Sequence, residues 1–251
     1  MGKYAKNFLT NVIVRVDFLN EIDLDDKIPI EISKQIMEFF PISEPKKLIG
    51  RTVKFNPVEK KMEFEGEDST ATEWHFHGKH RTKSLILTSK SFVIIYTVYD
   101  SFETLKSEFM SIFKIISDVF TKDLQINRFG LRYVNEINLN ESNPMDWKKY
   151  INDNLLQAFD FSSDNGVIAR LLNNIAFNFD DIILNFNSGM HNPDFPAPIR
   201  KKIFVLDYDA SYIGLIDFDE IEDSLIRFHS KIEEMFELSI KPPLREIMND
   251  S

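Results

Sequence analysis

The chain contains no cysteine, and it has only 8 glycines and 2 tryptophans in 251 residues. The lack of cysteine excludes a disulfide framework, a thiolate nucleophile, an iron–sulfur cluster and thiolate-bound zinc, and it suits a reducing compartment. No stretch reaches the roughly 18 apolar residues that a membrane helix requires, and the first ten residues lack the apolar run of a signal peptide. We therefore expect a cytoplasmic protein that does not bind a membrane.

Several motifs that mark well-known reactions are also missing. The sequence has no GxGxxG or GxxxxGK[ST] phosphate loop, no GxSxG elbow, no HExxH pair and no EF-hand spacing. The sequence thus leaves open whether the protein is an enzyme, but it favours a role without catalysis. It implies no cofactor.

The net charge of the chain limits which ligands it is expected to bind, and its aromatic content predicts the composition of its core. With 30 basic and 40 acidic residues the formal charge is −10. A chain of this charge repels a polyanion, which disfavours broad nonspecific binding of nucleic acid but leaves room for a local basic patch. The 23 phenylalanines predict a core built from phenyl rings.

The apolar periodicity predicts a succession of strands interrupted by single helices. Helical spacing is predicted for residues 29–40, for a helix capped by Asp100 with Glu103, for 143–159, and for a helix capped by Asp217 with Glu220. Alternation predicts strands at residues 11–18, 48–55, 61–65, 73–77, 84–87, 91–99, 124–139, 168–179, 182–187 and 201–208.

This order of elements predicts an α+β fold with antiparallel sheets and amphipathic helices packed on one face. The pattern of hairpin, strand and long helix occurs twice, so we expect two similar halves at residues 1–160 and 167–251. The segment 161–166, rich in Ser, Asp, Asn and Gly, is the expected linker. The halves are closely packed units or parts of one domain.

The segment from Arg128 to Asn135 is the most distinctive string in the chain. On a strand, Arg128 and Arg132 project together on one face, across Gly130, while the core side takes Phe129, Leu131 and Tyr133. Guanidinium groups so placed bind carboxylates or phosphates. We therefore predict an anion or partner site with Arg128, Arg132, Tyr133 and Asn135. Alternatively, both arginines pair with acidic side chains of the chain itself.

Three histidines lie close together in the sequence. His75 and His77 share one face of a predicted strand, and His80 follows in the next turn. Imidazoles in this arrangement are able to bind zinc, nickel or copper, although no carboxylate pattern completes the site. The alternative is an exposed polar face on the strand that carries Trp74 and Phe76.

The loop at residues 187–198 is long for a hairpin connection and contains three prolines. Long loops are often binding elements, and the prolines lower the entropy lost when such a loop contacts a partner. We predict partner contact through Met190, His191, Asp194 and Phe195, with a plain surface loop as the alternative.

Four short segments carry a resemblance to a known family. They are the Arg128–Asn135 segment, the strand Phe204–Tyr208, the helix with Phe228 and His229, and the terminal Leu244–Met248. Together they resemble a sporadically distributed, conserved prokaryotic family of roughly this length, with an R-x-G-L-R-Y-x-N segment and a similar terminal motif. The resemblance implies no activity and no catalytic residues. The family's patchy distribution implies an accessory gene, such as a component of antiviral defence or of a toxin–antitoxin system.

Three functional hypotheses follow. The first is a noncatalytic adaptor that binds another protein, through the loop at 187–198 or a sheet edge. The second is a nucleotide or nucleic-acid binding module that uses Arg128 and Arg132. The third is a metal-dependent hydrolase built on the three histidines. We favour the adaptor.

Overall fold

The computed structural model describes residues 4–24, 28, 30–50, 53–56, 60–64, 69–120, 124–139, 141–161 and 163–249. The fold is α+β, as predicted. Nine strands form one antiparallel sheet in the order β2-β5-β6-β7-β1-β8-β11-β10-β9, and β3 pairs with β4 in a separate two-stranded sheet. The strands are β1 Leu9–Phe18, β2 Ile42–Gly50, β3 Val53–Asn56, β4 Lys61–Phe64, β5 Ser69–His77, β6 Lys83–Leu87, β7 Ser91–Tyr96, β8 Ile126–Asn138, β9 Leu171–Phe179, β10 Ile182–Met190 and β11 Ile203–Ile216.

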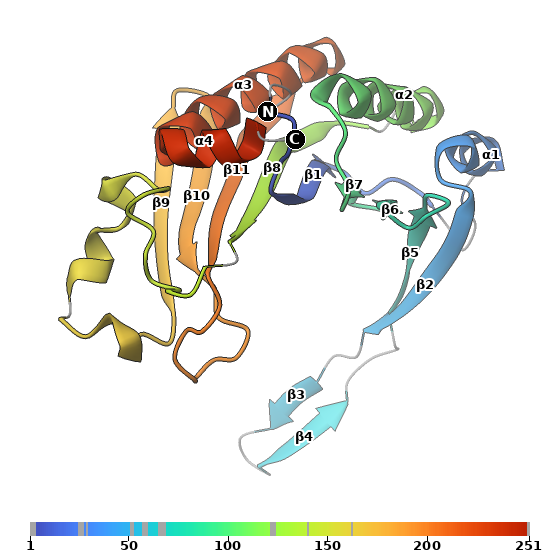
Figure 1. The fold of residues 1–251 in the computed structure, drawn as a ribbon. Coiled ribbons are helices and arrows are strands. Elements are labelled where there is room, and N and C mark those ends of the chain that lie inside the picture. The colour runs from blue at the N-terminus through green and yellow to red at the C-terminus, as the bar shows by residue number, and fades with distance from the viewer. Residues whose placement is uncertain are drawn as a thin grey trace.

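The α-helices lie on one side of the nine-stranded sheet, as Figure 1 shows. They are α1 Ile30–Phe39, α2 Phe102–Phe120, α3 Ile221–Ser239 and α4 Pro242–Asn249. The sheet bends beneath them into an arch, and its inner face carries no helix (Figure 1). Among the described helices, none combines the length and the apolar character that crossing a membrane would require.

Phenylalanine rings fill the space between the sheet and the helices, as the composition predicted. Phe109 of α2 packs between Phe92 of β7 and Phe129 of β8, at centroid distances of 5.9 Å and 5.4 Å. Phe129 also contacts Phe228 of α3 at 5.4 Å. All four side chains are at most 1% exposed. One continuous core therefore joins both long helices to the centre of the sheet.

The helix predicted for residues 143–159 is wrong. This segment consists of turns and of short 3₁₀ helices at Asp153–Leu155 and Gln157–Phe161. Asparagine side chains accept hydrogen bonds from the backbone two residues later, Asn143 from Met145 at 3.0 Å and Asn152 from Asn154 at 3.0 Å. Such local bonds compete with helical ones. The apolar spacing that suggested a helix reflects burial instead.

One of the two predicted capping boxes is present. The backbone N–H of Asp217 donates to the Glu220 carboxylate at 3.2 Å, although a 3₁₀ turn at Phe218–Glu220 precedes α3. At α2 the predicted box between Asp100 and Glu103 is wrong. There the hydroxyl of Ser101 accepts the backbone N–H of Thr104 at 3.1 Å, so the cap lies one residue later.

The strand pairing shows how the repeated pattern is organised. In the first part β1 pairs with β7, the strand that precedes α2; in the second part β8 pairs with β11, the strand that precedes α3. The two leading strands β1 and β8 pair with each other at the centre of the sheet. Strand β8 therefore pairs both with β1 of the first part and with β11 of the second.

Candidate binding face of the sheet

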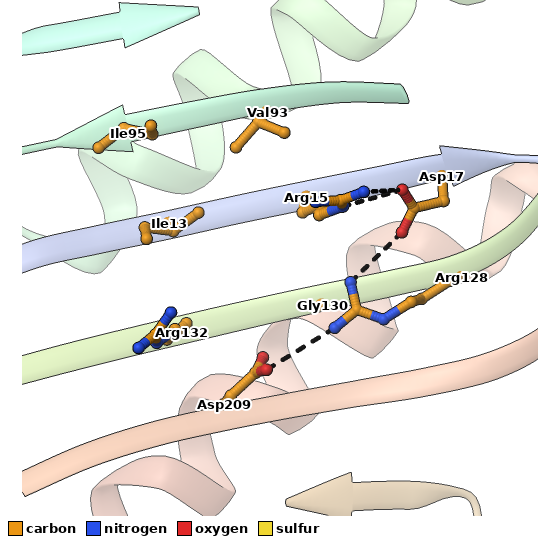
Figure 2. Close-up of a pocket in the computed structure, with 9 residues that line it drawn as sticks. All are labelled: Ile13, Arg15, Asp17, Val93, Ile95, Arg128, Gly130, Arg132 and Asp209. Atoms are coloured by element: carbon orange, nitrogen blue, oxygen red, sulfur yellow. Dashed lines mark hydrogen bonds and ion pairs between the residues drawn. The ribbon is translucent and has the colours of Figure 1, made fainter. Parts of the chain in front are cut away.

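Alternation along β8 separates a covered face from an open one. Phe129, Leu131 and Tyr133 are fully buried on the helix side. Arg128 and Arg132 extend from the other face, with Gly130 between them, as the sequence predicted (Figure 2). The arginines therefore lie on the inner face of the arch, which we call the open face.

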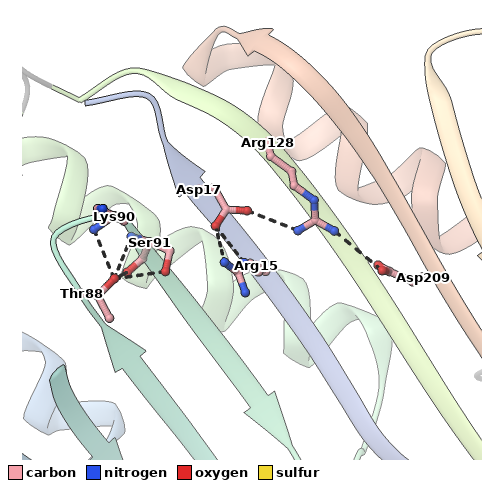
Figure 3. A network of polar contacts seen from close by, with 7 residues as sticks. All are labelled: Arg15, Asp17, Thr88, Lys90, Ser91, Arg128 and Asp209. Carbon is pink, nitrogen blue, oxygen red and sulfur yellow. Dashed lines mark hydrogen bonds and ion pairs between the residues drawn. The ribbon is translucent and has the colours of Figure 1, made fainter. Parts of the chain in front are cut away.

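A chain of ion pairs crosses three adjacent strands on the open face. Arg15 donates through Nε to Oδ1 of Asp17 at 2.8 Å, and Arg128 Nη1 lies 3.3 Å from Oδ2 of the same aspartate. Arg128 Nη2 reaches Oδ2 of Asp209 at 3.7 Å (Figures 2 and 3). Alternating charges thus connect β1, β8 and β11.

A second polar chain continues from β8 to the edge of the sheet. Arg132 binds the Asp207 carboxylate with two hydrogen bonds of 2.8 Å each, from Nε and Nη2. Asn187 Nδ2 donates to Asp207 at 3.3 Å, and Asn174 Nδ2 donates to Asn187 Oδ1 at 2.7 Å. One side chain from each of β8, β11, β10 and β9 therefore takes part in a continuous line of hydrogen bonds.

The open face carries charges of both signs. Burial raises the pKa of Asp209, while the guanidinium groups of Arg128 and Arg132 oppose that rise. The hydrogen bonds to Asp207 raise the pKa of Arg132. With Arg15 and Asp17, three arginines face three aspartates, and Glu136 adds a further carboxylate. The lining is therefore not basic, which agrees with the alternative that the arginines pair within the chain.

Two depressions lie on the open face, and Arg132 lines both of them. The first has a volume of ≈ 440 Å³ and is lined by Ile13, Arg15, Asp17, Val93, Ile95, Arg128, Gly130, Arg132 and Asp209. The second has a volume of ≈ 810 Å³ and is lined by Arg132, Val134, Glu136, Leu172, Asn173, Asn174, Asn187, His191, Pro193, Ile203, Val205 and Asp207.

A glycine accompanies each depression. Gly130 lines the first, where a Cβ would lie 3.2 Å from Cβ of Ser211. In the second, Gly189 pairs with Leu172 on one side and Val205 on the other. Its φ is +140°, and a Cβ there would lie 2.1 Å from the backbone oxygen of Leu171. The lack of a side chain between two lining residues helps to keep the face hollow.

Tyr133 and Asn135 do not share a face with the two arginines. Both are fully buried on the helix side, and Asn135 Nδ2 donates to the backbone oxygen of Leu206 at 3.4 Å. The four predicted residues therefore do not form one site. The alternation of the strand already carries this information, because 133 and 135 have the same parity as Phe129.

The predicted partner loop adjoins the second depression. His191 lines it, whereas Met190 is buried at the end of β10. Asp194 is exposed, and Phe195 is 54% exposed. Because His191 and Arg132 line the same hollow, the structure joins two features that the sequence presented as separate candidates.

A buried asparagine side chain anchors the loop. Asn192 is 5% exposed, and its Nδ2 donates to the backbone oxygens of Ala169 at 3.0 Å and Ala197 at 2.7 Å. The Arg170 guanidinium lies 4.3 Å from the ring centroid of Phe195. These contacts tie both ends of the loop to the segment that leads into β9.

The three histidines of the predicted metal site lie at the other end of the sheet. His75 Nε2 contacts Glu73 at 3.0 Å, and His77 Nε2 contacts Glu44 at 3.4 Å. His80 is exposed in the turn after β5. Across the described residues, no group of three or more His, Asp or Glu side chains is placed to hold a metal ion.

Sequence reasoning missed most of the acidic and amide partners on the open face. Arg15 and Asp17 alternate with the buried valines of β1, and this alternation is the signal that places them on the open face. The alternation predicts a strand that ends at residue 208, which puts Asp207 and Asp209 at its end. In the structure β11 continues to Ile216, so both lie within a strand.

A buried hydrogen-bonded network lies behind the arginine strand. The Tyr133 hydroxyl is 3.0 Å from Nδ1 of His229 and 3.1 Å from the Tyr99 hydroxyl. The His229 ring stacks on Phe102 at 3.8 Å and is 9% exposed as a residue. Burial lowers the pKa of His229 from 6.5 to about 4, against an opposing effect of Glu103. His229 is therefore a neutral packing residue.

This histidine gives the fold a defined pH dependence. Because the pKa is lower in the folded chain, the unfolded chain takes up the proton first as the pH falls from about 6.5 towards 4, and stability is lost across that window. Between about pH 7 and pH 5 we expect the wild type to lose about 2 kcal/mol more than His229→Gln. Urea unfolding of both chains at the two pH values measures this difference, and equal losses would contradict it.

The comparisons with known proteins add little. No protein-family model and no curated protein matches the chain. Among solved structures, the chain is similar to "Methanococcus jannaschii TBP" at 12% identity and a TM-score of 0.26, over 91% of this chain and 99% of that chain.

Proposed function

We propose that the protein is a noncatalytic interaction subunit that receives a segment of a partner protein in the second depression. The proposal rests on one observation: Arg132 of the sheet and the loop residues His191 and Pro193 line the same hollow of ≈ 810 Å³. A rigid sheet forms the floor of the hollow and a loop forms its wall, and binding residues are often arranged in this way.

The lining suits an extended peptide. Apolar contacts come from Val134, Leu172, Ile203 and Val205. Asparagine amides both donate and accept hydrogen bonds. Asn174 is exposed and uses one amide hydrogen on Asn187, so its carbonyl oxygen and second amide hydrogen are able to pair with the backbone N–H and C=O groups of such a segment. Apolar side chains of the peptide would fill the hollow while its backbone bonds the rim.

The polar residues of the hollow are ordered before any partner arrives. Asp207 holds Arg132, Asn187 holds Asp207, and Asn192 anchors the loop. Less side-chain entropy is lost on binding when the groups are already fixed. This preorganisation supports the proposal that the hollow is a binding surface.

The setting of this role follows from the resemblance described above. An accessory prokaryotic gene suits a cytoplasmic adaptor, and we propose that the partner belongs to the same defence or toxin–antitoxin system. The anion-binding alternative has weaker support, because Arg15, Arg128 and Arg132 already pair with aspartates. A polyanion would have to displace those carboxylates.

Native mass spectrometry of the chain isolated from its own host tests the proposal. We expect a protein partner at a fixed stoichiometry with the wild type, and its loss with Val205→Glu, which places a charge among the apolar lining residues. The matched control is Val98→Glu, because Val98 is 64% exposed and lies outside both depressions. Retention of the partner by Val205→Glu, or a bound nucleotide in place of a protein, would contradict the proposal.

A further inference from the structure

Strand β9 ends the described sheet at one side, and its composition is unusual for an edge strand. Its nine residues, LLNNIAFNF, include no charged side chain and no proline, in a chain that is 28% charged. Edge strands that avoid pairing usually carry lysine, proline or a bulge. No register shift interrupts the pairing of β9 with β10. Nothing in β9 therefore opposes the addition of another strand.

The opposite edge of the same sheet shows the contrast. Strand β2 carries Pro45 followed by Lys46 and Lys47. Proline removes a backbone donor, and lysines repel the approach of a second charged edge. One edge of the sheet thus has the usual protection and the other lacks it.

The middle of β9 is accessible. Asn174, Ile175 and Ala176 are exposed one after another, although consecutive residues of a strand point to opposite faces. Ile175 is 38% exposed. Both faces are therefore uncovered at the centre of this edge. β9 is the last strand on its side of the sheet (Figure 1), and nearer its start the Asn173 amide donates to the backbone oxygen of Leu155 at 3.2 Å.

Charged residues of opposite sign flank the uncharged strand symmetrically. Arg170 lies five positions before Ile175 and Asp180 lies five positions after it. Both are exposed and lie one residue beyond the ends of β9; the Arg170 guanidinium contacts the Phe195 ring at 4.3 Å, and Asp180 lies in the turn. When two copies of β9 run antiparallel about Ile175, Arg170 of each copy comes near Asp180 of the other.

The backbone agrees with this register. The two-residue turn at Asp180 and Asp181 closes the β9–β10 hairpin, so the even-numbered residues of β9 direct their N–H and C=O groups away from β10. Pairing about Ile175 sets Asn174 opposite Ala176 of the other copy. Even-numbered residues then face even-numbered residues, as hydrogen bonding requires.

We propose that the chain forms a homodimer in which β9 pairs antiparallel with β9 of a second copy, centred on Ile175 and flanked by two Arg170–Asp180 ion pairs. The sheets of the two copies become continuous, with their open faces on the same side. Because Leu172 and Asn174 belong to both β9 and the second depression, the two depressions lie next to each other across the symmetry axis.

Sedimentation velocity of the purified chain over a range of concentrations tests the dimer without any partner. We expect the wild type to sediment at twice the chain mass at high concentration. Arg170→Asp and Asp180→Arg each set like charges opposite one another, so each is expected to weaken dimerisation at least tenfold. The double variant restores opposite charges and is expected to dimerise again.

A second pair of variants separates loss of dimerisation from loss of folding. Ile175→Lys places two like charges at the symmetry centre and is expected to yield a monomer, while Val98→Lys dimerises like the wild type. Circular dichroism checks that all variants are folded. A wild-type monomer at every concentration, or a dimer that withstands both single charge reversals and Ile175→Lys, would overturn the inference. Val205→Glu lies on an internal strand, so failure of the partner proposal leaves this test unaffected.

Discussion

Replacing Phe129 with alanine is expected to lower the free energy of unfolding by about 3 to 5 kcal/mol, the usual range for a buried phenylalanine. Its ring is fully buried and packs against Phe109 of α2 and Phe228 of α3, each at 5.4 Å. The substitution leaves a cavity where both long helices meet the central strand, and these elements are too constrained to close it. Urea unfolding followed by circular dichroism measures the loss.

The matched control for this change is Phe161→Ala. Phe161 is 96% exposed, so the same chemical truncation removes little packing and is expected to change the free energy by less than about 0.5 kcal/mol. Losses of similar size at both positions would show that Phe129 is not part of a core shared by the two helices.

Gly189→Ala is expected to destabilise the chain by about 3 kcal/mol or more. The residue has φ +140°, which L side chains rarely adopt, and the added Cβ would lie 2.1 Å from the backbone oxygen of Leu171. Strands β9 and β10 must separate to admit the methyl group, which disturbs the second depression.

Gly166→Ala is the control for that substitution. A Cβ at Gly166 meets only the side-chain oxygen of Asp164, at 3.3 Å, and no positive φ strains it. We expect a change below about 1 kcal/mol there. Thermal unfolding of both variants measures the two losses of stability. An unaltered melting temperature for Gly189→Ala would contradict the strained geometry.

The elements with strong local periodicity were predictable from the sequence. Alternation identified β1 and β8 and correctly assigned the faces of Arg128 and Phe129, because a half-buried strand repeats with period two. The apolar stripe from Phe102 to Phe120 identified α2 in the same way. These features depend on residues close in the chain, so a single sequence is enough to reveal them.

Features that depend on distant pairing were not predictable. Arg128 and Asp17 are separated by 111 residues in the sequence, and Arg132 and Asp207 by 75. Nothing local in the sequence indicates that these charges meet on one face. The helix predicted for residues 143–159 is wrong for another reason. Side-chain hydrogen bonds, such as the one that Asn152 accepts from the backbone of Asn154, compete with the helical hydrogen bonds that the apolar spacing suggests.

The neighbours of β8 in the sheet were also not predictable. Its composition predicts a long strand but gives no information on its neighbours, and it pairs with both β1 and β11. Strand order in an antiparallel sheet is set by long-range packing, which the local pattern does not contain.

The central claim is that a partner protein occupies the second depression of the open face. The most direct test replaces Val205 with a photoreactive phenylalanine analogue in the host, with the same replacement at Val98 as the control. Irradiation is expected to yield a single covalent adduct from position 205, joined to a peptide of one partner, and none from position 98. Equal adducts at both positions, or none at 205 while the chain remains folded, would contradict the account.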